Sequence, residues 1–244
     1  MIKIIFHITK FVIATLTALL FASCNFNMNA IEGSGNVTTE KRTVQGDFTN
    51  IKVSNAIDVV IEQADSKEIT VEADDNLQKE IVTKVENGTL IIECKYSSFR
   101  NITSKKVTVK MPVVDKIEAS SASSVHTKNT IEGENITLET SSAASMQVNI
   151  ESDKISVDSS SGSSVNIEGK SLSVSTSVSS GGSIDADKLM ANDIQAEASS
   201  GGTISVRPIV SLKAKASSGG NINYSGTPKT IEKSESSGGN VSKS

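Results

Sequence analysis

The stretches "SSGGTI" at 199–204, "SSGGNI" at 217–222 and "SSGGNV" at 236–241 repeat one pattern, in which small polar residues precede an aliphatic residue. Small polar residues bury little apolar surface, so their recurrence must serve the geometry of the backbone. Glycine adopts positive φ readily, and a pair of glycines permits a sharp bend. Serines of successive copies can stack, each hydroxyl with a partner in the next copy. The pattern predicts a tight corner repeated along the structure.

The corner belongs to a longer repeat of about 19 residues that extends through 116–244. One apolar residue ends each Ser/Gly tract, and a second, β-prone one precedes most of these by ten positions. The first set is Val125, Met146, Val165, Ile184, Ile204, Ile222 and Val241, and the second is Ile136, Ile155, Val174, Ile194, Leu212 and Ile231. Apolar and polar residues alternate around them, which indicates strands with one buried face, and the Ser, Gly, Val, Ile and Thr content disfavours helix.

This repeat predicts an all-β fold, a right-handed single-stranded parallel β-helix (β-solenoid) with coils of about 19 residues. Stacking at about 4.8 Å per coil would bury the apolar rows and pair the backbone groups, and crossovers of this kind are right-handed. A disordered Ser-rich stalk is the alternative, because 33 of residues 117–244 are serine. The constant register of the apolar residues and the scarcity of proline favour the solenoid.

We expect residues 40–244 to form one domain. Residues 40–115 contain longer, less regular strands, which we interpret as coils that begin the same solenoid as 116–244, and "ENGT" at 86–89 predicts a hairpin between two of them.

In the last repeat, Lys233 replaces the alanines Ala196 and Ala214. A charge at this place would protect the terminal edge from pairing with another strand.

The N-terminus carries an export signal. Two lysines precede the apolar run "FVIATLTALL" at 11–20, and "FASC" follows at 21–24. We predict a signal peptide over 1–23, a lipidated Cys24 that anchors the protein in the bacterial outer membrane, and a flexible tether within 24–39. An ordinary signal peptide that ends near a cysteine is the alternative.

The charge and the cysteine content argue against a nucleic-acid-binding protein and against a disulfide-bonded one. The chain has 24 Lys and Arg and 28 Asp and Glu, interspersed and without a basic cluster, which argues against a nucleic-acid partner. Cys94 is the second of two cysteines. If Cys24 is lipidated, no internal disulfide can form, and we interpret Cys94 in its strand-like run as a buried structural residue.

No catalytic, cofactor or metal site emerges from the sequence, and we predict a protein that is not an enzyme. Five acids in the repeats are scattered: Asp158, Asp185, Asp187, Asp193 and Glu197. They form no column that could hold calcium or act as acid and base, and Asp185 and Asp187 are expected to face solvent. His126 is the sole histidine after residue 23, and no G-x-S-x-G motif accompanies it.

One loop combines aromatic and cationic residues. Tyr96, Phe99 and Arg100 lie in "KYSSFRN" at 95–101, in a chain without tryptophan. Aromatic residues with arginine are typical of binding hot spots, so these three form our candidate contact patch. The alternative is a capping loop packed over the first coils.

The segments "GSGNVTTEKRTVQGDFTNIKVSNAIDVVIEQ" (33–63) and "KKVTVKMPVVDKIEASSASSV" (105–125), with the Ser-Ser-Gly coils, resemble the bacterial family named putative auto-transporter adhesin, head GIN domain. The resemblance covers nearly the whole mature chain. It implies a right-handed parallel β-helix, frequent lipoprotein signals, and no catalytic residues.

Three functions follow as hypotheses. The first is a lipid-anchored envelope protein for adhesion, with a glycan or protein ligand held by many weak contacts. The second is a periplasmic structural or assembly factor, since "NFNMN" at 25–29 lacks the acids that often direct such lipoproteins to the surface. The third, a glycan-active enzyme, is the weakest because acids do not converge.

Overall fold

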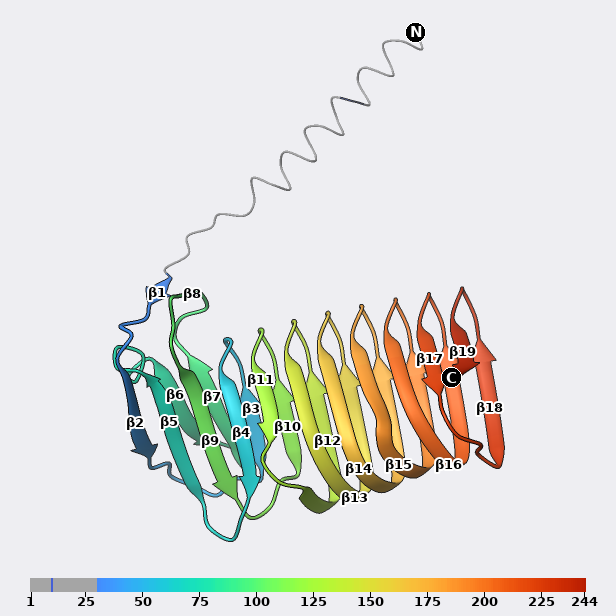
Figure 1. Cartoon of the computed structure of the whole chain (residues 1–244), viewed down its shortest axis with the longest axis horizontal. Helices are drawn as coiled ribbons and strands as arrows, with labels where there is room; N and C mark the ends of the chain where they lie inside the picture. Colours follow the sequence, from blue (N-terminus) through green and yellow to red (C-terminus); the bar gives the residue numbers. More distant parts are fainter. Residues whose placement is uncertain (1–9, 11–29) are drawn as a thin grey trace.

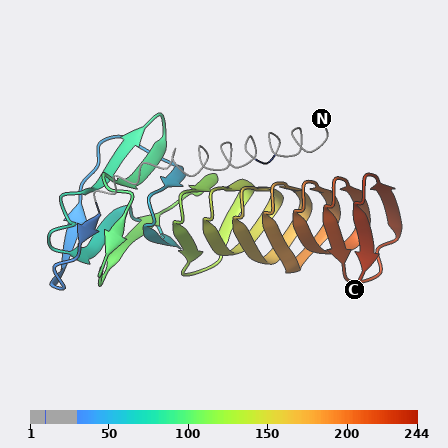
Figure 2. The ribbon, with the colours of Figure 1, turned by 90° about the horizontal axis from the view of Figure 1, so that it is seen from above.

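The computed structural model describes Lys10 and residues 30–244. Cys24 and, apart from Lys10, the predicted signal peptide lie outside these residues. Every element between residues 30 and 244 is a strand, and the strands stack side by side along one axis (Figures 1 and 2). Among the described residues, no helix has the length and apolar character needed to cross a membrane. The strands are β1 (Ile31–Glu32), β2 (Val37–Arg42), β3 (Asn50–Val53), β4 (Asp58–Gln63), β5 (Glu68–Asp74), β6 (Ile81–Glu86), β7 (Thr89–Cys94), β8 (Phe99–Arg100), β9 (Lys105–Met111), β10 (Lys116–Ala119), β11 (Ser124–Thr127), β12 (Ile131–Thr140), β13 (Ser145–Ser159), β14 (Ser164–Val178), β15 (Ser183–Ala198), β16 (Thr203–Ala216), β17 (Asn221–Tyr224), β18 (Thr230–Glu235) and β19 (Asn240–Lys243).

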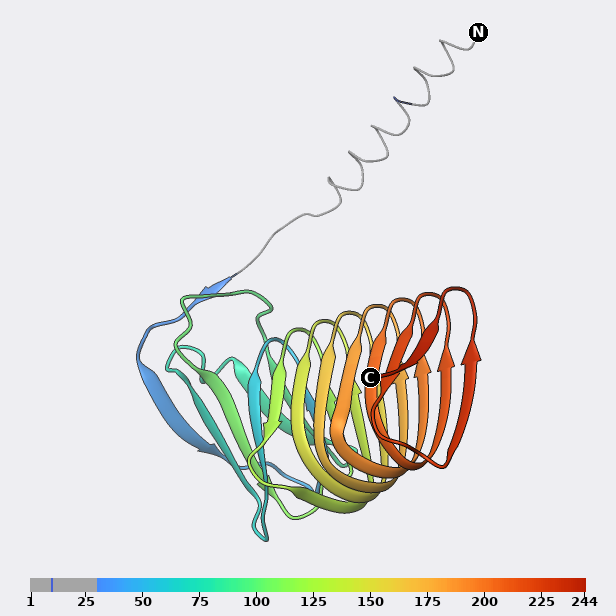
Figure 3. The same cartoon turned by 45° about the vertical axis from the view of Figure 1, so that its right-hand side comes forward.

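Each regular coil has two straight segments joined by a broad bend at one edge and a tight turn at the other (Figure 3). Within β14, the first segment, the broad bend and the second segment form one continuous strand. Val165 pairs in parallel register with Met146 of the preceding coil and with Ile184 of the next. These partners lie 19 residues apart, so the predicted β-solenoid and its coil length are confirmed.

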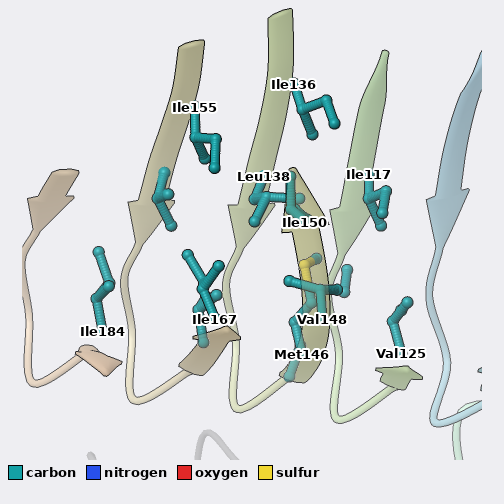
Figure 4. Packing of buried hydrophobic residues seen from close by; sticks show 14 of the residues in the cluster. Ile117, Val125, Ile136, Leu138, Met146, Val148, Ile150, Ile155, Ile167 and Ile184 are labelled. Carbon is teal, nitrogen blue, oxygen red and sulfur yellow. The ribbon is translucent and has the colours of Figure 1, made fainter. Parts of the chain in front are cut away.

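The core lies between the two layers of straight segments. All seven residues that end the Ser/Gly tracts are buried, with at most 5% of their surface exposed, and they pair in register from coil to coil. Figure 4 shows three of them, Val125, Met146 and Ile184, inside the core. The second predicted row is buried as well, except for Ile231, which is 41% exposed. Ile231 belongs to β18 in the last coil, where no further coil covers it.

The two glycines of the tight turn have different roles. In the turn at 217–220, Ser218 and Gly219 adopt φ of 49° and 74°, whereas Gly220 does not have positive φ. A Cβ on Gly220 would lie 2.4 Å from the Ala198 carbonyl oxygen, so the second glycine makes room for the neighbouring coil. The Gly219 amide donates to the Ser237 carbonyl, at 3.2 Å. In the described turns, backbone hydrogen bonds of this kind join one turn to the next. The hydroxyl-to-hydroxyl bonds that we expected between the serine pairs of successive turns do not form there.

Residues 40–115 wind less uniformly than the sequence suggested. The pairs β3–β4 and β7–β9 form coils that stack in parallel, but β9 lies between β4 and β5 in the sheet. β5 pairs antiparallel with β9 and β2, and β6 pairs antiparallel with β7. The β6–β7 hairpin turns at Asn87 and Gly88, both with positive φ, which confirms the hairpin predicted at 86–89.

Part of the segment expected to be a tether is built into the fold. β1 pairs with β8, and β2 pairs with β5, so residues 31–32 and 37–42 are strands. The buried Asp74 carboxylate accepts hydrogen bonds from the amides of Gly35 at 3.1 Å and Ser104 at 2.9 Å. These bonds hold the N-terminal segment against the first coils, which explains why it is not a free linker.

The last coil ends in a polar cap. Lys233 and Glu235 occupy the register positions at which the preceding coil has Ala214 and Ala216. The Lys233 ammonium lies 4.7 Å from the centre of the Tyr224 ring and donates to the Val241 carbonyl at 3.1 Å. Glu235 accepts from the Val241 amide at 2.6 Å. The charge expected at the terminal edge therefore covers the open end of the core.

Candidate functional site: a groove along the broad bends

A groove of about 660 Å³ follows the broad bends of β12 to β16. These bends form the edge of the solenoid opposite the tight turns, where the long strands curve continuously (Figure 3). The direction of the groove is that of coil stacking, so successive coils contribute successive parts of its wall. We treat this groove as the candidate functional site.

Register explains the shape of the groove. At each bend one residue lies in a central row, and these residues pair from coil to coil in the order Gly133, Ser152, Ser171, Ala191 and Pro208. All but Gly133 are buried. Residues on either side of this row point outward and form two walls. One wall contains Glu132, Glu151, Lys170 and Met190, and the other contains Asp153, Leu172, Asn192 and Ile209.

Two inward serines shape the bend by hydrogen bonding to backbone carbonyls. The Ser152 hydroxyl lies 3.1 Å from the Glu134 carbonyl and 2.9 Å from the Lys154 carbonyl. The Ser171 hydroxyl repeats this pattern one coil later, with the Asp153 and Ser173 carbonyls at 3.3 and 3.0 Å. A hydroxyl has one proton, so each serine shares it between its own bend and the preceding coil. The floor of the groove is therefore fixed across coils.

Gly169 fixes the entry into one of these bends. Its φ is 126°, a conformation that side chains disfavour. A Cβ at this position would lie 2.0 Å from the Ile150 carbonyl oxygen of the preceding coil. Only glycine allows the two coils to approach so closely beside the groove.

The groove gathers exposed apolar side chains at one end. Leu172, Met190 and Ile209 are 55%, 42% and 48% exposed, and they come from three successive coils. They are half of the six large apolar side chains that are exposed in the described part of the chain. Scattered apolar residues are normal on a surface, but several that line one concave site are typical of a binding surface.

The other end of the groove is acidic. Glu132, Glu151 and Asp153 line it, together with one cation, Lys170. The Lys170 ammonium lies 3.4 Å from the Glu151 carboxylate, and both side chains are well exposed. The ion pair compensates one acid, so Glu132 and Asp153 leave this end with negative charge.

The arrangement provides contacts but no recognisable reaction centre. Within the described residues, no three His, Cys, Asp or Glu side chains are placed to hold a metal ion. His126 is exposed on β11, in register with Val60 and Gln147. Asp185 and Asp187 are both exposed, as expected for a solvated face.

The predicted contact patch lies at the other edge of the solenoid. Its loop, residues 95–104, joins β7 to β9 where a regular coil has its tight turn. Tyr96 and Phe99 are half-buried and pack against the core, while Arg100 is exposed. The Lys105 ammonium lies 4.9 Å from the centre of the Phe99 ring. The three side chains thus do not form one exposed surface, the packing favours the capping alternative, and a contact role for the loop stays a prediction.

Cys94 lies just before this loop and is buried, as the sequence suggested. Burial raises the pKa of its thiol, which keeps it protonated and unreactive at neutral pH. Asn55 donates to the Cys94 carbonyl at 3.0 Å and to the Tyr96 carbonyl at 3.3 Å. These bonds tie the loop to the first tight turn.

Sequence reasoning missed the groove, although a signal was available. Leu172 stands between Ser171 and Ser173 in a bend where Leu172 and Ser173 are both exposed, so an apolar residue occurs where the buried pattern is interrupted. Met190 and Ile209 occupy bends of the next two coils. Aligning the repeats on their buried residues would have brought these outward apolar residues together.

The fold and the site define the chain as a parallel β-solenoid with an open lateral groove. The model of the family described as putative auto-transporter adhesin, head GIN domain, matches residues 47–228, and the chain belongs to this family. A search of curated proteins gives no match. The match to the family model confirms the resemblance seen in the sequence.

Solved structures share the fold. A putative adhesin from Bacteroides fragilis has a TM-score of 0.81 at 22% identity, over 88% of this chain and 100% of the other. A putative lipid binding protein and a putative adhesin, both from Parabacteroides distasonis, have TM-scores of 0.72 and 0.69 at 23% and 25% identity, with the same coverage of both chains. The family and these neighbours are named as adhesins or binding proteins, and none of them as an enzyme. Adhesin-family relatives suggest a protein of the cell surface or envelope.

Proposed function

We propose that this chain is a lipid-anchored, non-enzymatic protein of the bacterial outer membrane that binds a surface protein or polymer, as an adhesion module does. The observation that carries the proposal is the groove along the broad bends, in which Leu172, Met190 and Ile209 expose apolar surface over three coils. Contacts repeated along a stiff solenoid suit a long ligand better than a small molecule. The adhesin family supports the same role.

The position of the N-terminus suits this role. β1 pairs with β8 in the loop at the tight-turn edge, on the side of the solenoid away from the groove (Figures 1 and 3). Cys24 precedes Ile31 by seven residues, and a chain of that length spans at most about 25 Å. A lipid on Cys24 would therefore keep the tight-turn edge near the membrane and leave the groove on the far edge.

Two measurements on intact cells test this proposal. Metabolic labelling with an alkynyl fatty acid should mark the wild type and leave Cys24→Ser unlabelled. External protease should remove the protein from intact cells, and adhesion of those cells should fall with it. Labelling that survives in Cys24→Ser would overturn the lipid anchor.

Protection from external protease would instead favour the periplasmic structural or assembly role. That alternative has its own support, because the five residues after Cys24, "NFNMN", contain no acid. New reducing ends released from a glycan panel by the purified protein would contradict the non-enzymatic role.

A further inference from the structure

The dimensions of the groove limit what can fill it. Its central row runs through five coils, from Gly133 to Pro208, and four stacking steps of about 4.8 Å give a length of roughly 19 Å. An extended polypeptide advances about 3.3 Å per residue, so about six residues would fill this length. The groove is open along its side, which allows a segment within a longer chain to enter.

The side chains of the groove point to a ligand with two chemical characters. Leu172, Met190 and Ile209 would cover apolar groups at one end. At the other end, Glu132 and Asp153 would attract a cation, because the nearby Lys170 is already paired with Glu151. An apolar group and a cation must therefore lie about two coils apart on one ligand.

Other classes of ligand fit these residues less well. No aromatic side chain lines the groove, so sugar rings would have no surface on which to stack. The acids Glu132, Glu151 and Asp153 would repel anionic polymers and the phosphates of lipid headgroups. An extended polypeptide offers apolar side chains, a Lys or Arg side chain and backbone groups that Asn192 can bind.

We propose that the groove binds an extended polypeptide segment of about six residues in which apolar side chains lie about three residues from a Lys or Arg side chain. This inference rests on the proposed function, in that the groove is the binding face. The apolar side chains of the segment lie against Leu172, Met190 and Ile209. Its cation lies between Glu132 and Asp153.

The test is a selection of displayed random octapeptides on the mature protein, residues 24–244, followed by affinity measurements on the enriched peptides. The selected sequences should combine apolar residues with Lys or Arg. Binding should weaken at least about tenfold in the double variant Leu172→Ser/Ile209→Ser, a loss equivalent to one or two buried apolar contacts. It should weaken several-fold in Glu132→Gln/Asp153→Asn and at high salt.

Matched controls separate the groove from the rest of the surface. Ile231→Ser changes an exposed isoleucine outside the groove, and Glu197→Gln neutralises an exposed acid on another face. Both should bind the selected peptides like the wild type. All substituted residues are exposed, so melting temperatures should stay close to that of the wild type, and a collapsed variant would be recognised by circular dichroism.

Several outcomes would overturn the inference. They are enrichment of acidic peptides, no enrichment over the naive library, and binding that the groove variants leave unchanged. Dimerisation lost in Leu172→Ser/Ile209→Ser would assign the groove to a second copy of this chain. Binding to zwitterionic phosphatidylcholine vesicles that is lost in the same variant would assign the groove to lipid. Protease shaving of cells is independent of these results, so the surface role and the peptide ligand can fail separately.

Discussion

Gly220 faces Ala198 of the neighbouring coil so closely that a Cβ on Gly220 would lie 2.4 Å from the Ala198 carbonyl oxygen. Gly219, its neighbour in the same turn, has φ of 74° and no atom within 4 Å of where its Cβ would be. The chain places alanine in this left-handed conformation elsewhere, at Ala122 and Ala143. In this turn the second glycine is thus the one that the close approach of the two coils requires, whereas earlier turns have Ser123, Ala144 and Ser163 at the corresponding position.

Gly220→Ala should therefore destabilise the protein more than Gly219→Ala. Backbone of two coils must move apart to accept the new methyl group, at a cost of about 3 kcal/mol. Gly219→Ala should cost only about 1 kcal/mol of stability, because alanine must adopt a left-handed backbone conformation there. Chemical denaturation of both variants measures the difference, and an equal or larger loss in Gly219→Ala would contradict the packing argument.

Ile222→Asp should lower the free energy of unfolding by more than about 4 kcal/mol. Ile222 is fully buried in the row that stacks from coil to coil, and a carboxylate there would have no partner. Ile204 lies one coil earlier and is equally buried, so Ile204→Asp should behave in the same way. Leu172→Asp is the control, since Leu172 lies outside the buried rows with 55% of its surface exposed, and its substitution should change the melting temperature little. Similar melting of Ile222→Asp and the wild type would refute the observed coil register.

The sequence predicted the coils because a buried row leaves a periodic signal. Residues such as Val165, Ile184 and Ile204 recur at the coil length, and burial on one face forces the alternation around them. The order of strands near the N-terminus leaves no such signal. β9 enters between β4 and β5, and such pairing depends on long-range contacts, which no local pattern records.

The sites were less predictable than the fold. Tyr96 and Phe99 suggested a contact surface by residue type, but aromatic residues serve equally well as packing groups, and here they lie half-buried against the core. Outward residues such as Leu172 and Ile209 do not contribute to the buried period. Their proximity follows only from the stacking register, which must be established before the surface can be interpreted.

Lys233→Ala/Glu235→Ala should make the protein associate end to end. These two side chains cover the open end of the core through Tyr224 and Val241, and alanine would continue the row of the preceding coils. An uncovered solenoid end presents unpaired backbone groups and apolar surface to another chain. Sedimentation velocity should show concentration-dependent oligomers in the double variant and not in the wild type. A variant that stays monomeric at all concentrations would show that the cap does not prevent association.

Glu118 should contribute a small, pH-dependent part of the stability. Burial alone would raise the pKa of this carboxyl, but hydrogen bonds from Lys116 and Lys52 outweigh burial and hold the pKa below its ordinary value of 4.5. A lowered pKa in the folded state stabilises the fold above pH 4.5, and this stabilisation disappears as the pH falls through the lowered value.

The matched variant is Glu118→Gln, which keeps the shape of the side chain and removes its charge. At about pH 7 the variant should be less stable than the wild type by up to about 1 kcal/mol, because the ion pairs are partly exposed. At about pH 3 the two proteins should be closer in stability. Urea denaturation at both pH values provides the comparison, and a difference that grows on acidification would have the wrong sign.

The groove runs in the direction in which the coils stack, so the number of coils, and not the length of any loop, determines its length. Duplication of one coil would extend the recognised segment by about 4.8 Å, and a substitution in one coil would alter a single step of recognition. Ligand preference in this architecture is divided into units that correspond to coils. Such a protein can acquire a new partner through a few outward substitutions while its buried rows stay unchanged.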